Sequence, residues 1–432
     1  MSQLAASPPD QHDQAAHVRA RRQLDLGQLI PQAGFGRTLA GLLIVVGIAA
    51  IAGVVVMGLS GSAEAAKATK THALAGYHMG FLYVLSLALG CLGLQMILQQ
   101  FNAGWAATVR RQAETIASLV WVPFLLWIPI AVLETGVFKG YLFKWMDPVY
   151  TAGDPLFEIK KAFLNPTFWN IRGVSYFILW ICLATALYRL SRKQDQTGDR
   201  WLTAKARWIS SWGLLLFALS TAFASFDWLM TLDYHWFSTM FGVYFFAGSM
   251  VTTIALLCVI LTTLRLSGRL GPTFTQEHQH DLGKLLKAFT VFWAYITFCQ
   301  YFLIWYANIP EETAFYNLRN DGGYGPLFWV LAFGHFLVPF LVLLFRGVKR
   351  NANALRLVAL WMLIMHAVDL YYMVRPQVKN VKVGDNLLID ILGLLGPVLL
   401  FLGLVVWKMA RAPLTPIKDP RLHEVLEHKN YV

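Results

Sequence analysis

The chain has 432 residues, of which 57% are hydrophobic and only 14% are charged. Soluble globular domains carry roughly 25% charged residues, so this composition excludes an ordinary soluble fold. The apolar residues form continuous blocks of about twenty residues, the length that crosses a hydrocarbon core roughly 30 Å thick. Because these blocks do not alternate in polarity as β-barrel strands do, we predict an all-α polytopic membrane protein.

The net charge of +12 and the four cysteines restrict the function further. Basic residues collect on the cytoplasmic side of membrane proteins, so the positive charge does not require a nucleic-acid partner. The cysteines fall within apolar blocks and form no CxxC or CxxCH motif: Cys91, Cys182, Cys258 and Cys299. We therefore expect no disulfide, iron–sulfur cluster or covalently attached haem in this chain.

Hydropathy predicts ten spans between a polar N-terminal arm (1–36), which lacks a signal-peptide pattern, and a polar tail (411–432). In chain order the predicted spans are 37–59, 74–98, 115–133, 173–190, 209–226, 237–264, 284–306, 326–346, 355–374 and 387–408. An even number of spans puts both termini on one side, and 25 of the 36 Lys and Arg residues then fall on that side. By the positive-inside rule, both termini are expected in the cytoplasm.

The longest loop on the opposite side, 134–172, is rich in aromatic residues. Within it, Asp154 and Pro155 are residue types that favour an N-cap and a first helical position, so we predict a short helix over "LFEIKKAFLN". The aromatic content of the loop suits either the membrane interface or a partner protein, and the sequence leaves both open.

Acidic residues gather at or near the span ends on this expected outer side. They are Glu134, Asp227, Asp233, Glu311, Glu312, Asp369 and Asp390. Pro310 predicts the start of a helix whose first turn contains Glu311 and Glu312, and carboxylates are favoured there by the helix dipole. We also expect one of this pair to line a polar opening shared with Asp369 or with the 227–235 hairpin. The inner half of the membrane offers mainly Ser and Thr, which argues against a proton route across the whole membrane.

Asp369 lies inside the ninth predicted span, where a charge is costly and normally faces a partner or a water-filled cavity. His366, Asp369 and Tyr372 are spaced three apart, and we expect them to share one helix face. Such a stripe is what a proton exit or the wall of a quinol pocket requires. His366 and His335, on neighbouring spans, are open to three interpretations: a proton relay, polar contacts between helices, or ligation of a haem.

Aromatic and basic residues near the same side are candidates for the wall of a quinone pocket. They are His78, Trp228, Tyr234, His235, Trp305, Tyr306 and Arg375, with Trp236 and Tyr244 in the same aromatic set. Arg375 is also a candidate to fold back toward Asp369. Because aromatic residues are equally abundant in interface belts, this assignment rests on position alone.

Three segments resemble the ActF-type subunits of the bacterial alternative complex III: "FDWLMTLDYHWFSTMFGVYFFAG", "WYANIPEETAFY" and "FGHFLVPFLVLLFRGVKRN". These subunits belong to the NrfD/PsrC-like family of polytopic, quinone-interacting membrane proteins, and the resemblance covers about residues 37–410. It implies two four-helix bundles, at about 74–226 and 237–374, with the first and last spans peripheral. The sequence itself shows no clear internal repeat.

The resemblance also implies a role in a quinol:cytochrome c oxidoreductase of the bacterial inner membrane. The chain would handle protons near the periplasmic face. Whether it also binds quinone there is left open. The implied partners are an iron–sulfur subunit, multihaem cytochromes c and a second NrfD-like subunit, which hold the redox centres; lipid and a terminal oxidase are further candidates. In such complexes the ActC-like paralogue is the better candidate for quinol oxidation. A structural scaffold and a secondary transporter, which needs matched helix interruptions in two halves, are the alternatives.

Overall fold

The computed structural model describes residues 34, 36–60, 66–378 and 383–430, so most of the expected N-terminal arm lies outside the described residues. This described part contains no strand and ten helical segments that are long and apolar enough to cross a membrane. The segments are Arg37–Leu59, Lys67–Gln100, Gly104–Val137, Pro166–Thr197, Trp201–Leu232, Phe241–Leu266, Gly271–Ala307, Gly325–Leu344, Ala352–Gln377 and Leu387–Met409. They confirm the all-α polytopic membrane fold, and most extend beyond the predicted spans.

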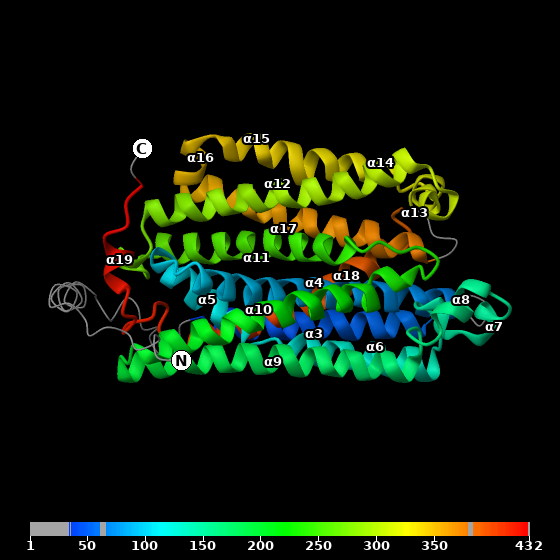
Figure 1. Cartoon of the computed structure of the whole chain (residues 1–432), viewed down its shortest axis with the longest axis horizontal. Coiled ribbons are helices and arrows are strands. Elements are labelled where there is room, and N and C mark those ends of the chain that lie inside the picture. The colour runs from blue at the N-terminus through cyan, green and yellow to red at the C-terminus, as the bar shows by residue number, and fades with distance from the viewer. Residues whose placement is uncertain (1–33, 35, 61–65, 379–382, 431–432) are drawn as a thin grey trace.

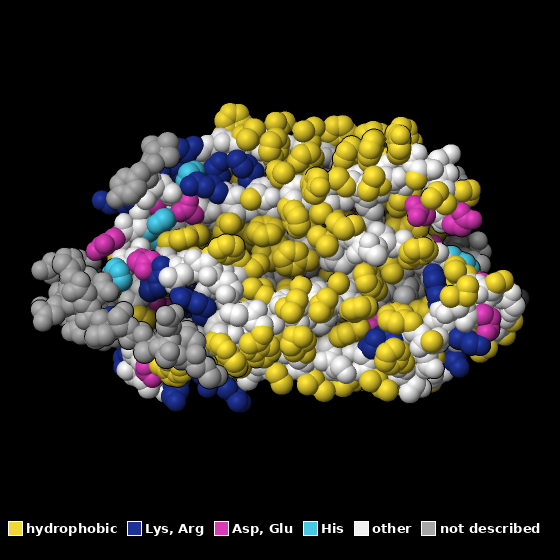
Figure 2. All heavy atoms as spheres, in the orientation of Figure 1, with side chains coloured by type: hydrophobic (Ala, Val, Ile, Leu, Met, Phe, Trp, Pro, Cys, Tyr) yellow, Lys and Arg dark blue, Asp and Glu magenta, His cyan; other side chains and the backbone are white. Residues whose placement is uncertain are grey.

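The long helices run side by side along one axis (Figure 1). One end of the molecule carries α19 (Leu422–Leu426), and we call it the tail end. The other carries α7 (Pro148–Thr151), α8 (Pro155–Lys160) and α13 (Pro310–Asp321), and we call it the loop end. On the face seen in Figure 2, hydrophobic side chains form a broad belt between the two ends of the molecule. The charged side chains gather at the two ends. A belt of this kind is what contact with a bilayer core requires.

The helices pack as two bundles and a peripheral pair. Bundle 1 contains α4 (Ala66–Gln100), α5 (Ala107–Ala117) followed by α6 (Trp121–Val132), α9 (Pro166–Thr197) and α10 (Trp201–Trp228). Bundle 2 contains α11 (Phe241–Leu266), α12 (Gln276–Ala307), α14 (Gly325–Val330) with α15 (Val338–Leu344), and α17 (Ala352–Val374). The bundles meet where α4 packs against α11 and α17, and α3 (Arg37–Leu59) and α18 (Leu387–Met409) pack on each other and on α4.

Glycines bring the backbone of α18 against both α3 and α4. A Cβ at Gly47 would lie 2.5 Å from the backbone nitrogen of Leu400, and one at Gly80 would lie 2.3 Å from the carbonyl oxygen of Gly393. Lipid is as apolar as the helices, so association within a membrane depends on close packing, which small residues allow. We infer that larger residues at these two positions would separate the peripheral helices from bundle 1.

A π-helical segment ends the third span, and another interrupts the eighth. The third span contains η2 (Leu133–Val137) and the eighth contains η6 (Leu331–Leu337) between α14 and α15. Prolines at 129 and 339 flank them and cannot donate a backbone hydrogen bond within the helix. The third span is the second helix of bundle 1 and the eighth is the third of bundle 2, so the interruptions are not matched between the bundles. Such segments frequently occur at functional sites, and these two hold Glu134 and His335.

The predicted short helix in the long loop is present as α8, and its start is confirmed. The Asp154 carboxylate accepts hydrogen bonds from the backbone N–H groups of Leu156 (2.9 Å) and Phe157 (3.4 Å). The helix ends at Lys160 and does not continue through "AFLN". The reason is local, because Asn165 is the N-cap of α9 and the chain must leave the helical conformation before it.

Candidate functional site

A cavity of about 330 Å³ lies in bundle 2 between α12, the α14–η6 segment and α17. Its walls are mainly aromatic and aliphatic: Tyr244, Val291, Trp293, Ala294, Tyr295, Thr297, Phe298, Gln300, Tyr301, Tyr316, Phe328, Leu331, Ala332, Phe336, Asp369, Tyr372 and Met373. The α12 side chains at its rim point outward into the apolar belt, with Tyr295 61% and Phe298 62% exposed. A lipid-soluble molecule therefore has access to the cavity from the side.

Asp369 is the only carboxylate among the lining residues, and it is 2% exposed. The hydroxyl of Tyr244, on α11, donates a hydrogen bond to Asp369 Oδ1. Among the described residues no cation forms an ion pair with this carboxylate, in contrast to most buried acids of the chain. Since its partner is a neutral phenol, Asp369 can gain or lose a proton without breaking an ion pair. A buried acid facing a cavity inside a span is the usual sign of a functional group.

The expected stripe of His366, Asp369 and Tyr372 is divided between two environments. Asp369 and Tyr372 line the cavity, whereas His366 turns toward bundle 1, where its Nε2 lies 2.9 Å from Ser86 Oγ on α4. Three residues advance a helix by about 300°, so each step along the stripe rotates by about 60° away from a common direction. His366 therefore joins the two bundles, while the other two residues face the cavity.

His335 lies behind the cavity wall in η6. Its ring packs on the indole of Trp293, with ring centroids 4.0 Å apart, and neither of its nitrogens has a hydrogen-bond partner among the described residues. Gly248 lets α11 approach, because a Cβ there would lie 3.3 Å from His366 Cε1 and 3.8 Å from Trp293 Cδ1. His335 and His366 thus lie where α11, α12, η6 and α17 pack together, and neither lines the cavity. This geometry does not assign either histidine as a haem ligand.

Arg319 is a residue that the sequence analysis missed. Its guanidinium is fully buried on α13, lies 3.4 Å from the centroid of the Phe315 ring, and donates to the carbonyls of Tyr372 and Met373 at 3.2 Å each. Burial lowers the pKa of Arg319. It caps the C-terminal end of α17, where cations are favoured, and so places a positive charge next to Tyr372 and Met373, which line the cavity. Its only signal in the sequence was that it is the single basic residue between the seventh and eighth spans.

Of the residues predicted for a quinone pocket, Tyr244 lines this cavity and the others do not. Trp305 and Tyr306 are 61% and 76% exposed on the outside of α12. Trp228 is buried in the aromatic core of bundle 1, where its carbonyl oxygen lies 2.6 Å from His78 Nε2. Only the neighbouring helices decide which side of a span is buried, and hydropathy does not contain that information for spans that are apolar all round.

Asp227 and Glu134 are held by structural contacts in bundle 1. Asp227 accepts two hydrogen bonds from Arg172, at 2.8 and 2.5 Å, and one from the hydroxyl of Tyr176 at 3.0 Å. The Glu134 carboxylate accepts from the backbone N–H groups of Leu142 (2.8 Å) and Phe143. Both carboxylates are therefore satisfied by fixed donors, which favours a structural role over proton transfer.

Arg375 was a candidate to fold back toward Asp369, and in the structure it pairs with another acid. It forms an ion pair with Asp390 on α18 (Nε–Oδ2 2.9 Å), and its Nη2 lies 2.7 Å from His72 Nδ1 on α4. The pair joins the peripheral helix to bundles 1 and 2 at the loop end. Two of the predicted candidates, Arg375 and Asp390, are therefore partners of each other. Arg375 follows the last turn of α17, and its acidic partner lies on α18.

The loop end contains a second acidic contact, between α8 and the 230–240 hairpin. The hydroxyl of Tyr234 donates to Asp154 (2.6 Å), and His235 Nε2 lies 2.8 Å from the same carboxylate oxygen. The hydrogen bond from Tyr234, followed by those from Leu156 and His235, lowers the pKa of Asp154 to about 2. Asp233 accepts from the backbone N–H of His235 (3.3 Å), so this cluster orders the hairpin.

Glu311 and Glu312 lie in the first turn of α13, which begins at Pro310 as predicted. Glu311 is exposed and Glu312 is partly exposed. Neither is among the residues that line the cavity containing Asp369. The structure thus confirms their place in the first turn and does not support the opening that we expected one of them to share with Asp369.

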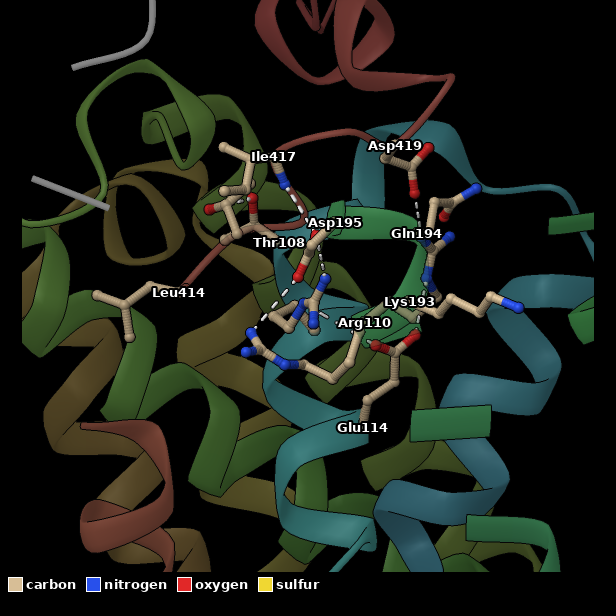
Figure 3. A network of polar contacts seen from close by, with 12 residues as sticks. Thr108, Arg110, Glu114, Lys193, Gln194, Asp195, Leu414, Ile417 and Asp419 are labelled. Atoms are coloured by element: carbon tan, nitrogen blue, oxygen red, sulfur yellow. Dashed lines mark hydrogen bonds and ion pairs between the residues drawn. The ribbon is translucent and has the colours of Figure 1, made fainter. Parts of the chain in front are cut away.

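At the tail end, a buried charge network corrects the expectation that the inner half offers mainly hydroxyl groups (Figure 3). Arg110 donates to Glu114 (3.2 Å) and to Asp419, and Arg111 donates to Asp195 (2.8 Å). The sequence placed these residues at boundaries and in loops. Helices α5 and α9 continue past the predicted span ends, and the C-terminal tail covers them, so the charges become buried together.

No protein-family model matches the chain, and no curated protein matches it. Among the described residues there is also no group of three or more His, Cys, Asp or Glu residues placed to hold a metal ion. The geometry of the cavity and the three sequence segments therefore carry the functional proposal.

Proposed function

We propose that the chain is a membrane subunit of a quinol-oxidising respiratory complex of the alternative complex III type, and that it accepts quinol protons in bundle 2. The observation that carries this proposal is the position of Asp369. It is the only acid among the described residues that line the aromatic cavity of bundle 2, and it is held by a tyrosine instead of a cation.

The cavity suits the ring of a quinol. Its volume of about 330 Å³ is within the range of small-molecule sites, which are mostly apolar with a few converging polar groups. Tyr301, Phe328 and Tyr316 offer aromatic faces, and Gln300 and Thr297 are further polar residues of the lining. The side opening toward lipid accommodates the isoprenoid tail, which stays in the bilayer.

Quinol oxidation releases two protons and two electrons. Asp369 accepts the two quinol protons in turn and releases the first before it takes the second, Tyr244 orients the carboxylate, and a redox centre of a partner subunit takes the two electrons. That this chain holds no redox centre of its own stays a prediction, which an absorption spectrum of the isolated subunit tests. The Arg319 guanidinium lies 5.2 Å from the centroid of the Tyr372 ring, which lines the cavity.

A scaffold function is the second candidate, because several acids are satisfied by structural contacts. The ion pairs of Asp227 with Arg172 and of Asp390 with Arg375 join helices. None of these four residues lines the cavity. The scaffold reading gives no reason for an unpaired carboxylate in a lipid-accessible cavity. Asp369 is therefore the residue at which the two functions differ.

The test replaces Asp369 with Asn in the assembled complex. We expect quinol-oxidation turnover or proton yield to fall by roughly 100-fold or more, as is common when a positioned proton acceptor is removed. Assembly should be unchanged, because Asn keeps the volume and still accepts a hydrogen bond from Tyr244.

Glu311→Gln is the matched control, since it also neutralises an acid at the loop end but lies outside the cavity. Turnover and proton yield of this variant should equal those of the wild type. If Asp369→Asn also assembles and runs at the wild-type rate with unchanged proton yield, the subunit is a scaffold.

A further inference from the structure

A second cavity, of about 190 Å³, lies at the loop end between α3, α4 and the α6–η2 segment. Its lining is apolar or aromatic except for one lysine: Ile51, Val54, Val55, Gly58, Leu59, Lys70, Ala73, Leu74, Tyr77, Pro129, Leu133 and Phe138. The hydroxyl of Tyr77 is already used, because it donates to the carbonyl of Leu126 (3.0 Å). The interior of this groove therefore presents hydrocarbon and ring faces, which suit an acyl chain.

The mouth of the groove carries two lysines on fixed supports. The Lys70 ammonium lies 5.3 Å from the centroid of the Phe138 ring, and that of Lys67, one turn earlier, lies 5.2 Å from the Tyr141 ring. The two rings stack on each other with centroids 5.1 Å apart. Neither lysine forms an ion pair with an acid in the part of the chain that the structure describes. Two adjacent cations at a membrane boundary attract an anionic headgroup.

A polar cavity of about 440 Å³ adjoins the same turns of α4. It is lined by Lys67, Ala68, Thr71, His72, Gly140, Tyr141, Lys144, Asp147, Tyr150, Gln377 and Val378. Lysines outnumber the single carboxylate, Asp147, and Thr71 adds a hydroxyl. The apolar groove thus ends at the lysine pair, and the polar cavity lies beside that pair at the same turns of α4, where it can hold a headgroup.

We propose that this groove binds one anionic glycerophospholipid, with an acyl chain along α3 and the phosphate between Lys67 and Lys70. From Ile51 to Leu59 the groove follows eight residues of helix, about 12 Å. A partner helix about 10 Å across would need several times the 190 Å³ that is present, whereas a single chain fits. The site is independent of the quinol cavity, which lies in the other bundle.

The experiment reconstitutes the full chain in nanodiscs of phosphatidylglycerol or phosphatidylcholine with identical acyl chains, then transfers it to mild detergent. Native mass spectrometry counts the lipids that stay bound. We expect one retained phosphatidylglycerol, and a weaker retention of phosphatidylcholine. Lys67→Gln and Lys70→Gln should each lower phosphatidylglycerol retention by roughly fivefold, and Val55→Phe, which fills the groove, should lower the retention of both lipids.

Two controls separate the site from general effects of charge and bulk. Lys139→Gln with Lys161→Gln removes two exposed lysines at the same end, and Val45→Phe adds the same bulk on α3 outside the groove. Both controls should retain lipid as the wild type does. Equal retention of the two lipids by the wild type, no retained lipid, or an equal loss in the control variants would each overturn the proposal.

Discussion

At the scale of single residues, the buried acids near the loop end differ in their partners, and Glu134 is bonded to backbone N–H groups. Asp227 and Asp390 are each paired with an arginine, whereas Asp369 is bonded to a phenol. A buried charge that loses its partner is destabilising, because the remaining charge is left uncompensated in a medium of low dielectric. Removal of these acids should therefore have opposite signatures: loss of stability for the paired acids and loss of activity for Asp369.

We predict that Asp227→Asn lowers the free energy of unfolding by roughly 3–5 kcal/mol, since Arg172 is then buried without a counter-charge. Thermal unfolding in detergent measures the effect as a lower Tm. Asp369→Asn leaves no cation unpaired and should melt close to the wild type. Equal melting temperatures for Asp227→Asn and the wild type would show that Arg172 does not depend on this carboxylate.

At the scale of elements, the C-terminal tail acts as a clamp on the ends of both bundles. Asp419 binds Arg110 on α5, and Thr415 Oγ1 lies 2.9 Å from Thr273 Oγ1 just before α12. Further along, His428 contacts Asp281 on α12. A sequence that reads as a polar, exposed tail thus becomes part of the folded membrane domain, because it supplies partners to charges that the helices alone leave buried.

We predict that Asp419→Ala destabilises the protein by roughly 3–5 kcal/mol, because Arg110 keeps only Glu114 as an acidic partner while Arg111 stays buried beside it. The measurement is the Tm in detergent together with the yield of monodisperse protein. Glu427→Ala, an exposed acid in the same tail, is the control and should behave as the wild type. A wild-type Tm for Asp419→Ala would contradict the clamp.

The contact between α8 and the hairpin should depend on pH at the acidic end. The folded pKa of Asp154, about 2, is below the unfolded value of about 3.9. Ionised Asp154 therefore stabilises the contact above pH about 4, and this stabilisation is lost as the pH falls toward 2. We expect a nitroxide at Ile159, which is 79% exposed on α8, to become more mobile across that range. In Asp154→Asn the mobility should be high at pH 6 already and change little with pH.

At the scale of the whole molecule, the ten spans place the tail end and the loop end on opposite sides of the membrane. The excess of Lys and Arg, 25 of 36, falls at the tail end and predicts that this end is cytoplasmic. We expect a reporter fused after Val432 to be active in the cytoplasm and one inserted at 150–156 to be active in the periplasm. The reverse pattern would place Asp369 near the cytoplasmic side. Protons taken up by Asp369 would then be released to the cytoplasm and not to the periplasm.

The sequence by itself determined the number of spans, their all-α character and the starts of α8 and α13. These features depend on local rules: backbone in lipid must satisfy its own hydrogen bonds, and Asp–Pro or Pro residues begin helices wherever they stand. Only the tertiary structure decided which acids are paired. Asp227 finds Arg172 55 residues away, and Arg375 turns to α18 and leaves Asp369 unpaired. The tertiary structure also decided where the cavity lies, because the space between α12 and η6 forms when both pack on α17. The pattern of residues in an apolar span does not predict how far apart two packed helices lie.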